Sequence, residues 1–399
     1  MHWRRNLWTV SAGLFLAQIS FSLIVPLLPP YLLELGLRHA VSTWSGLVFS
    51  LNALALAVMT PIWGSLSDYY GRRIMLIRSG IGVAAAYFLM GLVRDHLQLS
   101  VLRLADGAVG GLVPAGVMLL VANTPEEWLA FALGIVQTAA AVGGTLGPFL
   151  GGVIAGSIGI RGSLFFSAGL LVPATLLTFF GTREEYARPA VRQSFRRDLG
   201  GVLAEPSLRV ILIAFMLVQA GTVAVQPILP LFIAALVKVD AVYVTGIVFA
   251  LTGLSTAIGA PFVTKMRRWS YLTLLKGGIL AAAGMSLLQA CVRSVVLLGG
   301  LRFVFGFASA VMTVSGNVLI AQAVPREDRG KVVGVMHSVS ALGWMVGPMI
   351  GGYLGDRLGL AAAFLGSALL FLLAGGSLCW GRRLVGLTRV SGADRGICA

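Results

Sequence analysis

The sequence is poor in the residues on which soluble proteins and enzymes depend. Only 11% of its 399 residues are charged while 57% are hydrophobic, a balance outside the usual range of soluble globular domains. The three cysteines, Cys291, Cys379 and Cys398, have no CxxC or metal-ligand spacing, so we expect no disulfide framework. The four histidines are scattered along the chain. We therefore expect no metal site, no cofactor and no enzyme active site.

Acidic residues are especially scarce. The chain has 15 Asp and Glu against 30 Lys and Arg, which gives a net charge of +15. Such an excess would suit a nucleic-acid partner only on the surface of a soluble body, and a mean hydropathy of +0.91 excludes one. So much apolar surface needs lipid around it. In a membrane protein the basic residues report orientation instead, because cytoplasmic loops collect Lys and Arg.

Charged residues divide the sequence into long uncharged runs. A helix needs about 20 mainly apolar residues to cross a bilayer, and its backbone must satisfy its own hydrogen bonds there. The pattern therefore predicts an all-α membrane protein with twelve transmembrane helices. The fourth and tenth helices must extend backwards across Arg103 and Arg302, which places both arginines inside the membrane. The twelve uncharged runs of fifteen or more residues are 6–33, 39–67, 79–93, 107–125, 128–160, 162–182, 210–237, 241–264, 277–292, 303–325, 332–355 and 358–381.

The loops between these runs predict the orientation. With the N-terminus inside, 22 Lys and Arg lie on the cytoplasmic side, 6 outside and 2 within the membrane. We expect a multi-pass protein of a bacterial-type inner (plasma) membrane with both termini cytoplasmic. The hydrophilic stretch 182–209 is interpreted as a cytoplasmic linker. It separates an N-terminal bundle, 1–181, from a C-terminal bundle, 210–399, which ends in a short basic tail.

The two bundles repeat each other. A glycine pattern in the fifth helix recurs in the eleventh with the same spacing, 200 residues later. Matches also link helix 4 to helix 10 and helix 1 to helix 7 at offsets of 199 and 201. We therefore expect two pseudo-symmetric six-helix bundles that rock against each other around a site near the membrane midplane. The repeated glycine set is Gly134, Gly143, Gly147, Pro148, Gly151 and Gly152, matched by Gly334, Gly343, Gly347, Pro348, Gly351 and Gly352.

Three motifs carry a family resemblance over essentially the whole chain. The segment from Gly64 to Arg73 resembles the G-x-L-x-D-x-x-G-R-[KR] signature of the major facilitator superfamily. The glycine pattern of the fifth helix resembles the superfamily's antiporter motif, and Arg103 with Gly107 resembles its helix-4 motif. Together they point to the twelve-helix drug:proton antiporter branch of the superfamily, and the chain resembles the bacterial multidrug efflux transporters of that branch. Two departures are Asp106, where Gln or an apolar residue is more usual, and a decayed second copy of the signature after Pro261.

Arg103 and Asp106 are the first candidates for proton coupling. Spaced i, i+3, they lie on one face of a helix, and charges within a membrane normally face the bundle interior or water. We interpret Asp106 as the titrating acid and Arg103 as the residue that tunes it. The alternative is a self-neutralising structural ion pair. Glu34, at the outer end of the first helix, is a further candidate for proton entry or gating, with simple solvation as its alternative.

The signature segment has its own expected role. We expect the segment to be a loop after helix 2, because glycine permits a tight turn between helices 2 and 3. Asp68 can hold a neighbouring helix N-terminus, where a carboxylate is favoured. Arg72 and Arg73 can brace Asp68 or bind anionic lipid headgroups. By resemblance the segment is a latch that ties the halves together in the outward-facing state; alternatively its charges only set orientation. The latch residues are Gly64, Asp68, Gly71, Arg72 and Arg73.

The remaining polar residues of the spans suggest the substrate. By resemblance several of them line a central cavity, although each alone is more often a contact between helices. A cavity with so few charges suits lipophilic small molecules. Arg302 either mirrors Arg103 or contacts an anionic group. The cavity candidates are Gln18, Ser22, Gln219, Gln226, Arg302 and Asn317.

These features predict a secondary active transporter that exports lipophilic small molecules by proton antiport through alternating access. Such multidrug-type efflux gives antibiotic resistance. The alternatives are a lipid flippase or a dedicated metabolite exporter of the same fold, and, from another class, a non-transporting membrane receptor or enzyme. We expect a monomer in contact with membrane lipid and no nucleic-acid partner.

Overall fold

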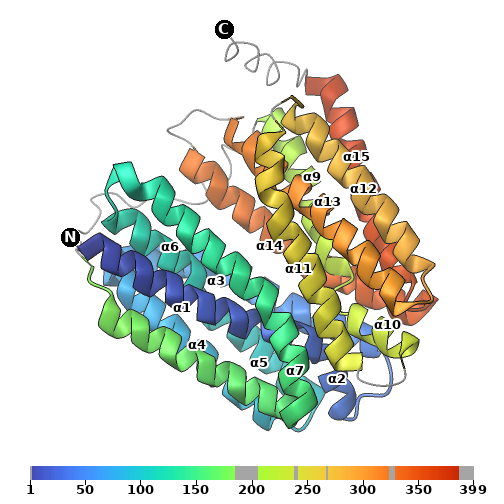
Figure 1. The fold of residues 1–399 in the computed structure, drawn as a ribbon, viewed down its shortest axis with the longest axis horizontal. Helices are drawn as coiled ribbons and strands as arrows, with labels where there is room; N and C mark the ends of the chain where they lie inside the picture. The colour runs from blue at the N-terminus through green and yellow to red at the C-terminus, as the bar shows by residue number, and fades with distance from the viewer. Residues whose placement is uncertain (1, 185–204, 238–240, 267, 323–328, 386–399) are drawn as a thin grey trace.

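The computed structural model describes residues 2–184, 205–237, 241–266, 268–322 and 329–385 (Figure 1). Within these ranges every regular element is helical. Residues 185–204 of the expected linker and the tail 386–399 lie outside the described residues. In order the helices are α1 (His2–Ile24), η1 (Val25–Leu27), α2 (Leu28–Glu34), α3 (Val41–Tyr70), α4 (Arg72–Leu92), α5 (His96–Val109), α6 (Leu112–Asn123), α7 (Glu126–Gly181), α9 (Pro206–Ala224), α10 (Leu229–Leu236), α11 (Ala241–Lys265), α12 (Tyr271–Ala290), α13 (Val295–Gln322), α14 (Arg329–Leu358) and α15 (Ala362–Val385).

The described residues contain ten helical segments long and apolar enough to cross a membrane. One of them, α7, has 56 residues, which as a straight helix would be about 84 Å long against a hydrocarbon core of about 30 Å. It turns back at Gly159, whose φ of 77° interrupts the helix, so that residues 126–158 and 160–181 form two arms (Figure 1). The 30-residue α14 is also longer than the about 20 residues that a membrane-spanning helix needs. These segments agree with an all-helical membrane protein, and the count of twelve transmembrane helices stays a prediction.

Three spans are broken, which the charge pattern does not reveal. One is the segment Leu208–Leu236, which is divided into α9 and α10. The first span bends at η1, where Pro26 lies in a 3-10 turn between α1 and α2. The fourth is divided into α5 and α6 at Gly110 and Gly111, because Gly111 has a φ of 112°. Neighbouring side chains bind the carbonyls released there: the Trp63 indole donates to the Ala108 oxygen at 2.6 Å, and Arg78 donates to the Gly110 oxygen at 3.3 Å.

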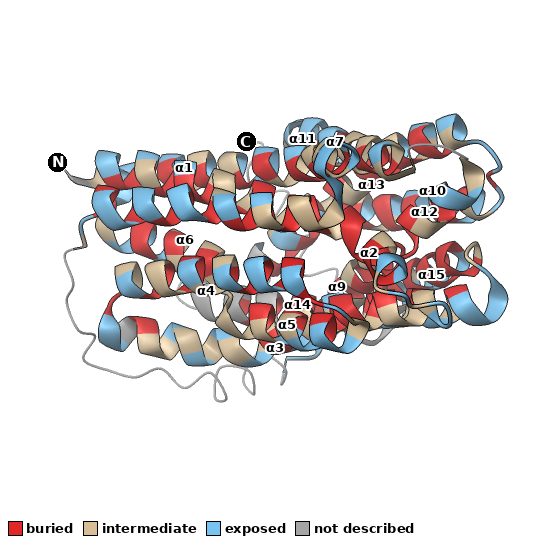
Figure 2. Cartoon of the chain, turned by 90° about the horizontal axis from the view of Figure 1, so that it is seen from below, coloured by how far each residue is buried: buried red, intermediate tan, exposed pale blue. Residues whose placement is uncertain are grey.

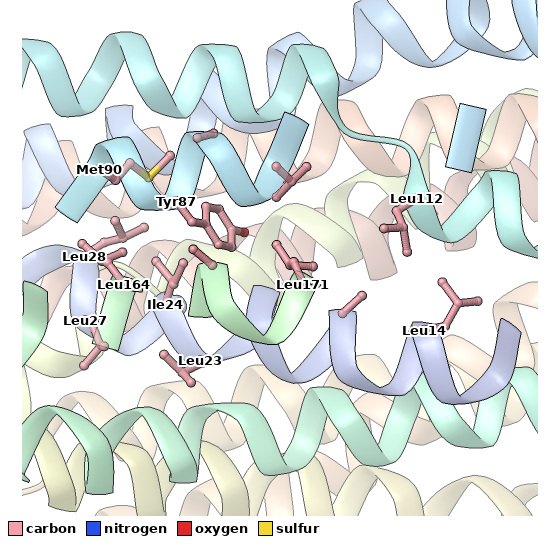
Figure 3. Close-up of a cluster of buried hydrophobic side chains, with 14 of the residues drawn as sticks. Leu14, Leu23, Ile24, Leu27, Leu28, Tyr87, Met90, Leu112, Leu164 and Leu171 are labelled. Atoms are coloured by element: carbon pink, nitrogen blue, oxygen red, sulfur yellow. The ribbon is translucent and has the colours of Figure 1, made fainter. Parts of the chain in front are cut away.

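Apolar side chains both fill the bundles and cover their outer faces. In the first half of the chain, α1 to α7, buried residues such as Ile24, Tyr87 and Leu171 form one cluster (Figure 3). Figure 2 shows that buried and exposed residues lie on different faces of the helices. Many of the exposed residues are apolar, among them Val296 at 81% and Phe180 at 69% exposure. Contiguous apolar surface of this kind marks an interaction site, and in a bundle of spans the partner is lipid.

The first half and the second half, α9 to α15, meet at the end of the bundle away from the N-terminus, which we call the distal end. There α3 packs on α14, α7 on α11, and the short α2 on α10. From this junction the helices of the two halves run at a clear angle to each other (Figure 1). The opposite end, which holds the start of α1 and the end of α7, is called the proximal end.

Candidate functional site: a buried charge cluster and a glycine-packed joint

Arg103 and Asp106 form an ion pair inside the first half. Arg103 Nη1 lies 2.7 Å from Asp106 Oδ2, and the two residues are only 7% and 5% exposed. This confirms that the i, i+3 spacing brings them together. The same carboxylate oxygen accepts a hydrogen bond from Asn52 Nδ2 of α3 at 2.8 Å. The result is a three-residue cluster on two helices, because one acid accepts from both a cation and an amide.

The neighbouring glycine explains how two helices can meet at the cluster. A side chain at Gly107 would collide with the Asn52 carbonyl, so only glycine lets α5 approach α3 this closely. The phenol of Tyr87 on α4 interacts with both charges from a third helix. Sequence reasoning missed Asn52 and Tyr87, which are ordinary polar residues within apolar runs. No motif signals either one.

The second half keeps the cation of this cluster but not the acid. Gly306 packs on the Thr252 carbonyl and Ser255 as Gly107 packs on Asn52, so the backbone arrangement repeats. The position matching Asp106 is Phe305 at the offset of 199. The Arg302 guanidinium is 5% exposed and lies 5.5 Å from the ring of Phe305 and 5.7 Å from that of Phe364. Arg302 therefore lies in the second half's own core, and its role in a substrate cavity stays a prediction.

Glu34 lies apart from the cluster. It ends α2 at the distal end, as expected, and accepts a hydrogen bond from Arg161 Nε at 3.3 Å. Arg161 also donates to the carbonyls of Gly91 and Val93, at 3.3 and 2.9 Å. Both partners of the ion pair are more than two-fifths exposed. Glu34 thus contacts the distal turns of the first half through Arg161, and its role in proton entry or gating stays a prediction.

The polar cavity candidates have mixed surroundings. Four of them, on or beside α1 and α9, are half-buried, and Asn317 on α13 is exposed. The Ser22 hydroxyl donates to the Gln18 carbonyl at 2.6 Å and reaches the Gly143 carbonyl at 3.3 Å, so it also binds α1 to α7. Their contact with a substrate stays a prediction. The half-buried four are Gln18, Ser22, Gln219 and Gln226.

The signature segment is helical rather than a loop, which corrects the sequence-based expectation. Gly64 and Asp68 lie within α3, and the turn is made at Gly71 alone, whose φ of 96° suits glycine. The side chain of Asp68 lies outside the described residues. Arg72 and Arg73 begin α4, where their backbone N–H groups donate to the Glu184 carboxylate, each at 2.9 Å.

The side chains of these two arginines bind within the first half. Arg72 donates to the carbonyl of Met118 at 3.2 Å, and Arg73 to that of Phe179. Glu184, on the chain just after α7, caps α4 through its carboxylate, and a capping carboxylate at a helix N-terminus is favoured. Sequence reasoning placed Glu184 in the linker and gave it no role. Its partners are backbone groups, which leave no pattern in a sequence.

The repeated glycines of α7 and α14 have a direct structural purpose. Gly143, Gly147 and Gly151 face the backbone of α1, where added side chains would meet the carbonyls of Phe15, Ile19 and Leu23. In α14, three glycines 200 residues later face α9 in the same way, against Met216, Ala220 and Ala224. The duplicated spacing therefore encodes a close helix pair within each half. Gly134, by contrast, has open space where a side chain would be.

Replacing two glycines of this motif should have opposite outcomes. Gly147→Leu inserts a side chain into the α1 contact, where the Ile19 carbonyl lies 2.6 Å from the position of an added Cβ. We expect loss of the monodisperse, folded protein in detergent, because an overpacked core costs about 1–3 kcal/mol or more. Gly134→Ala should keep or raise the melting temperature, since alanine favours a helix by about 1 kcal/mol over glycine. Equal melting temperatures for the two variants would contradict this packing.

The remaining motif residues build the joint between the halves. An added Cβ at Gly246 of α11 would lie 2.6 Å from the Pro148 carbonyl of α7. Gly46 of α3 lies against the Pro348 carbonyl of α14 in the same way. Beside it, the Ser50 hydroxyl donates to the Met345 carbonyl across the joint at 2.6 Å. Two equivalent contacts, α3 with α14 and α7 with α11, thus hold the distal end together.

The chain is similar to known proteins of one family. The family model of the Major Facilitator Superfamily matches residues 10–300 and 271–392 of the chain. Multidrug resistance protein MdtG of Enterobacter lignolyticus is 32% identical over 379 residues, which covers 93% of this chain and 91% of that protein. Multidrug resistance protein MdtG of Escherichia coli is 30% identical over 375 residues, with 92% of each chain covered.

Solved structures agree on the fold. The nucleoside transporter NupG superposes with a TM-score of 0.80 at 14% identity, covering 94% of this chain and 98% of that one. A bacterial homologue of the human lysosomal transporter Spinster, in an inward-facing and occupied conformation, gives 0.77 at 17% identity, with 94% and 96% covered. With the duplicated helix packing and the signature segment, these matches show that the chain is a multi-pass membrane protein that belongs to the Major Facilitator Superfamily.

Proposed function

We propose that the protein is a secondary active transporter that exports lipophilic small molecules in exchange for protons. The observation that carries this proposal is the buried cluster of Arg103, Asp106 and Asn52. Asp106 is a titratable acid buried within a predicted span, and a charge inside a membrane is expensive and is kept only with a partner or a function. The names of the similar MdtG proteins support multidrug-type efflux over the alternatives.

The proposed mechanism uses the cluster as an exchange switch. The carboxylate form of Asp106 accepts hydrogen bonds from Arg103 and Asn52, whereas a protonated carboxyl accepts fewer and donates one itself. Binding a proton therefore changes the contact between α5 and α3. Since α3 also forms the joint through Gly46 and Ser50, the change reaches the helix that must move. Each proton that enters across 100 mV contributes about 2.3 kcal/mol, which can drive export.

The proposed orientation places both termini in the cytoplasm of a bacterial-type cell, with the protein in the inner membrane. The distal end then faces outward, so a joint closed there describes the inward-facing state. We also propose a monomer made of two bundles, 1–181 and 210–399, joined by the linker 182–209. The protein has no cofactor, no enzymatic activity and no nucleic-acid partner.

Cysteine labelling tests this orientation. His39 is exposed at the distal end, and Glu127 is exposed at the proximal end. Each is replaced by cysteine, one at a time, in a variant without the three native cysteines. We expect a membrane-impermeant maleimide to label residue 39 in intact cells and residue 127 only after permeabilisation. The physical reason is the excess of Lys and Arg, 22 against 6, in the segments that the sequence predicts to be cytoplasmic. Labelling of residue 127 in intact cells would reverse the topology.

An efflux assay tests the function itself. Cells that produce the protein are loaded with a panel of fluorescent lipophilic cations, and the release of each cation is followed with and without an uncoupler. We expect export of several of them, and its loss when the uncoupler collapses the proton gradient. Export that persists with the uncoupler would refute proton antiport. Scrambling of a labelled phospholipid in proteoliposomes without any dye export would favour a flippase.

A further inference from the structure

The distal joint contains one carboxylate that bridges the halves. Asp356, near the end of α14 in the second half, accepts two backbone hydrogen bonds from the start of α3 in the first half. Its Oδ1 lies 3.1 Å from the Ser42 nitrogen, and its Oδ2 lies 2.7 Å from the Thr43 nitrogen. Both oxygens of one side chain therefore bind the same helix end.

The start of α3 needs such a partner. The first N–H groups of a helix have no acceptor within it, and the residue before α3, Ala40, offers no side-chain cap and has a φ of 53°. Asp356 satisfies two of these N–H groups from the other half. A carboxylate there also meets the positive end of the helix dipole, which favours the contact further.

The internal repeat allows the two contacts of the joint to be compared, and only the glycine packing is common to both. Gly352 packs on Ser42 and Thr43 as Gly152 packs on Val242 and Tyr243, so the two contacts share their backbone geometry. At the offset of 200, however, the counterpart of Asp356 is Gly156. Gly156 is exposed, and nothing lies within 4 Å of where its side chain would be. Among the described residues of these two contacts, only α3–α14 has a carboxylate between the helices.

We propose that Asp356 is the residue that holds the distal gate closed and so sets the balance between the two transport states. Opening the distal end moves α3 away from α14 and must break both hydrogen bonds together. In the α7–α11 contact the counterpart of Asp356 is Gly156, so the described residues of that contact can separate without losing such hydrogen bonds. Asp356 is a positioning residue and touches no substrate in this role. The proposal rests on alternating access, but not on protons or lipophilic substrates.

Distance measurements between spin labels test the gate directly. In a cysteine-free protein reconstituted in nanodiscs, labels at His39 and Leu358 report the distal end, and labels at Glu127 and Lys265 report the proximal end; all four residues are exposed. We expect Asp356→Ala to lower the ratio of distally closed to distally open molecules by about three- to tenfold, in the range of carboxylate effects at helix N-termini. Asp356→Asn, which keeps one acceptor and loses the charge, should give a smaller change in the same direction.

The repeat supplies both a control and a rescue. Gly156→Ala changes the equivalent position of the other contact, where there is room, and should leave both distance distributions unchanged. Gly156→Asp, combined with Asp356→Ala, places a carboxylate near the start of α11 and should restore the closed population. Unchanged distal distances in a folded, monodisperse Asp356→Ala protein would overturn the proposal. No substrate or proton gradient is present, so a failed efflux assay and a failed gate remain distinguishable.

Discussion

Asp106→Asn should abolish uphill, pH-driven export and leave downhill exchange of substrate intact. Asparagine has the size of the carboxyl group and can still accept from Arg103 and Asn52, which lie 2.7 and 2.8 Å from the native oxygen. It cannot take up and release a proton. The variant therefore resembles a permanently protonated carrier, which can move substrate both ways but cannot draw on the proton gradient.

The measurement uses proteoliposomes with an imposed pH gradient. We expect accumulation of a fluorescent substrate to fall to the protein-free level in the variant, while exchange of labelled for unlabelled substrate continues. Asp95→Asn is the matched control, because Asp95 lies just before the same helix and only caps it, accepting from the Gln98 nitrogen at 2.8 Å. Substrate concentrated against a gradient by Asp106→Asn would place coupling elsewhere, and Glu34 would be the next acid to test.

Asp68→Asn should reduce the export rate by tenfold or more without affecting folding. In the proposed inward-facing state the proximal end is open, and a latch acts only when that end closes. A hydrogen bond to a charged group contributes about 1.5–3 kcal/mol. Its loss would lower the population of the outward-facing state, relative to the inward-facing one, by about 10- to 100-fold. The second half has no equivalent acid after Pro261, so no second latch can substitute.

Transport rate and thermal stability, measured on the same preparations, separate this role from a structural one. Glu184→Gln is the comparison variant, because Glu184 caps α4 within the first half in the observed state. We expect it to lower the melting temperature, whereas Asp68→Asn should leave the melting temperature unchanged and slow export. A well-expressed Asp68→Asn protein with normal export would remove the latch from the mechanism.

The large-scale organisation could be read from the sequence because it depends on repetition and polarity. Long uncharged runs predict spans, and the duplicated glycine spacing predicts two equivalent helix pairs, which the contacts of Gly147 and Gly347 confirm. The pair of Arg103 and Asp106 followed from helical spacing alone. These features are local, or periodic, and need no knowledge of which helices are neighbours.

What sequence reasoning missed depends on contacts between distant segments. Asn52 lies 54 residues from Asp106, and no periodicity links α3 to α5. Asp356 and Glu184 bind backbone N–H groups, which any residue can supply, so their partners have no signature. The break at Gly111 was hidden because glycine is frequent throughout these helices, and the signature segment was expected to be a loop although Gly71 alone makes the turn.

The absence of an acid like Asp106 from the matching position of the second half has an electrical consequence. Phe305 lies at the position of the second half that matches Asp106. Among the described spans there is one buried ion pair, so the proposed mechanism has one carboxyl group, that of Asp106, to carry a proton. One proton would then enter for each substrate that leaves. Export of a singly charged cation would move no net charge, so the pH difference alone would drive it and the membrane voltage would not. Export of a neutral molecule would carry one positive charge inward, and both components of the proton-motive force would contribute.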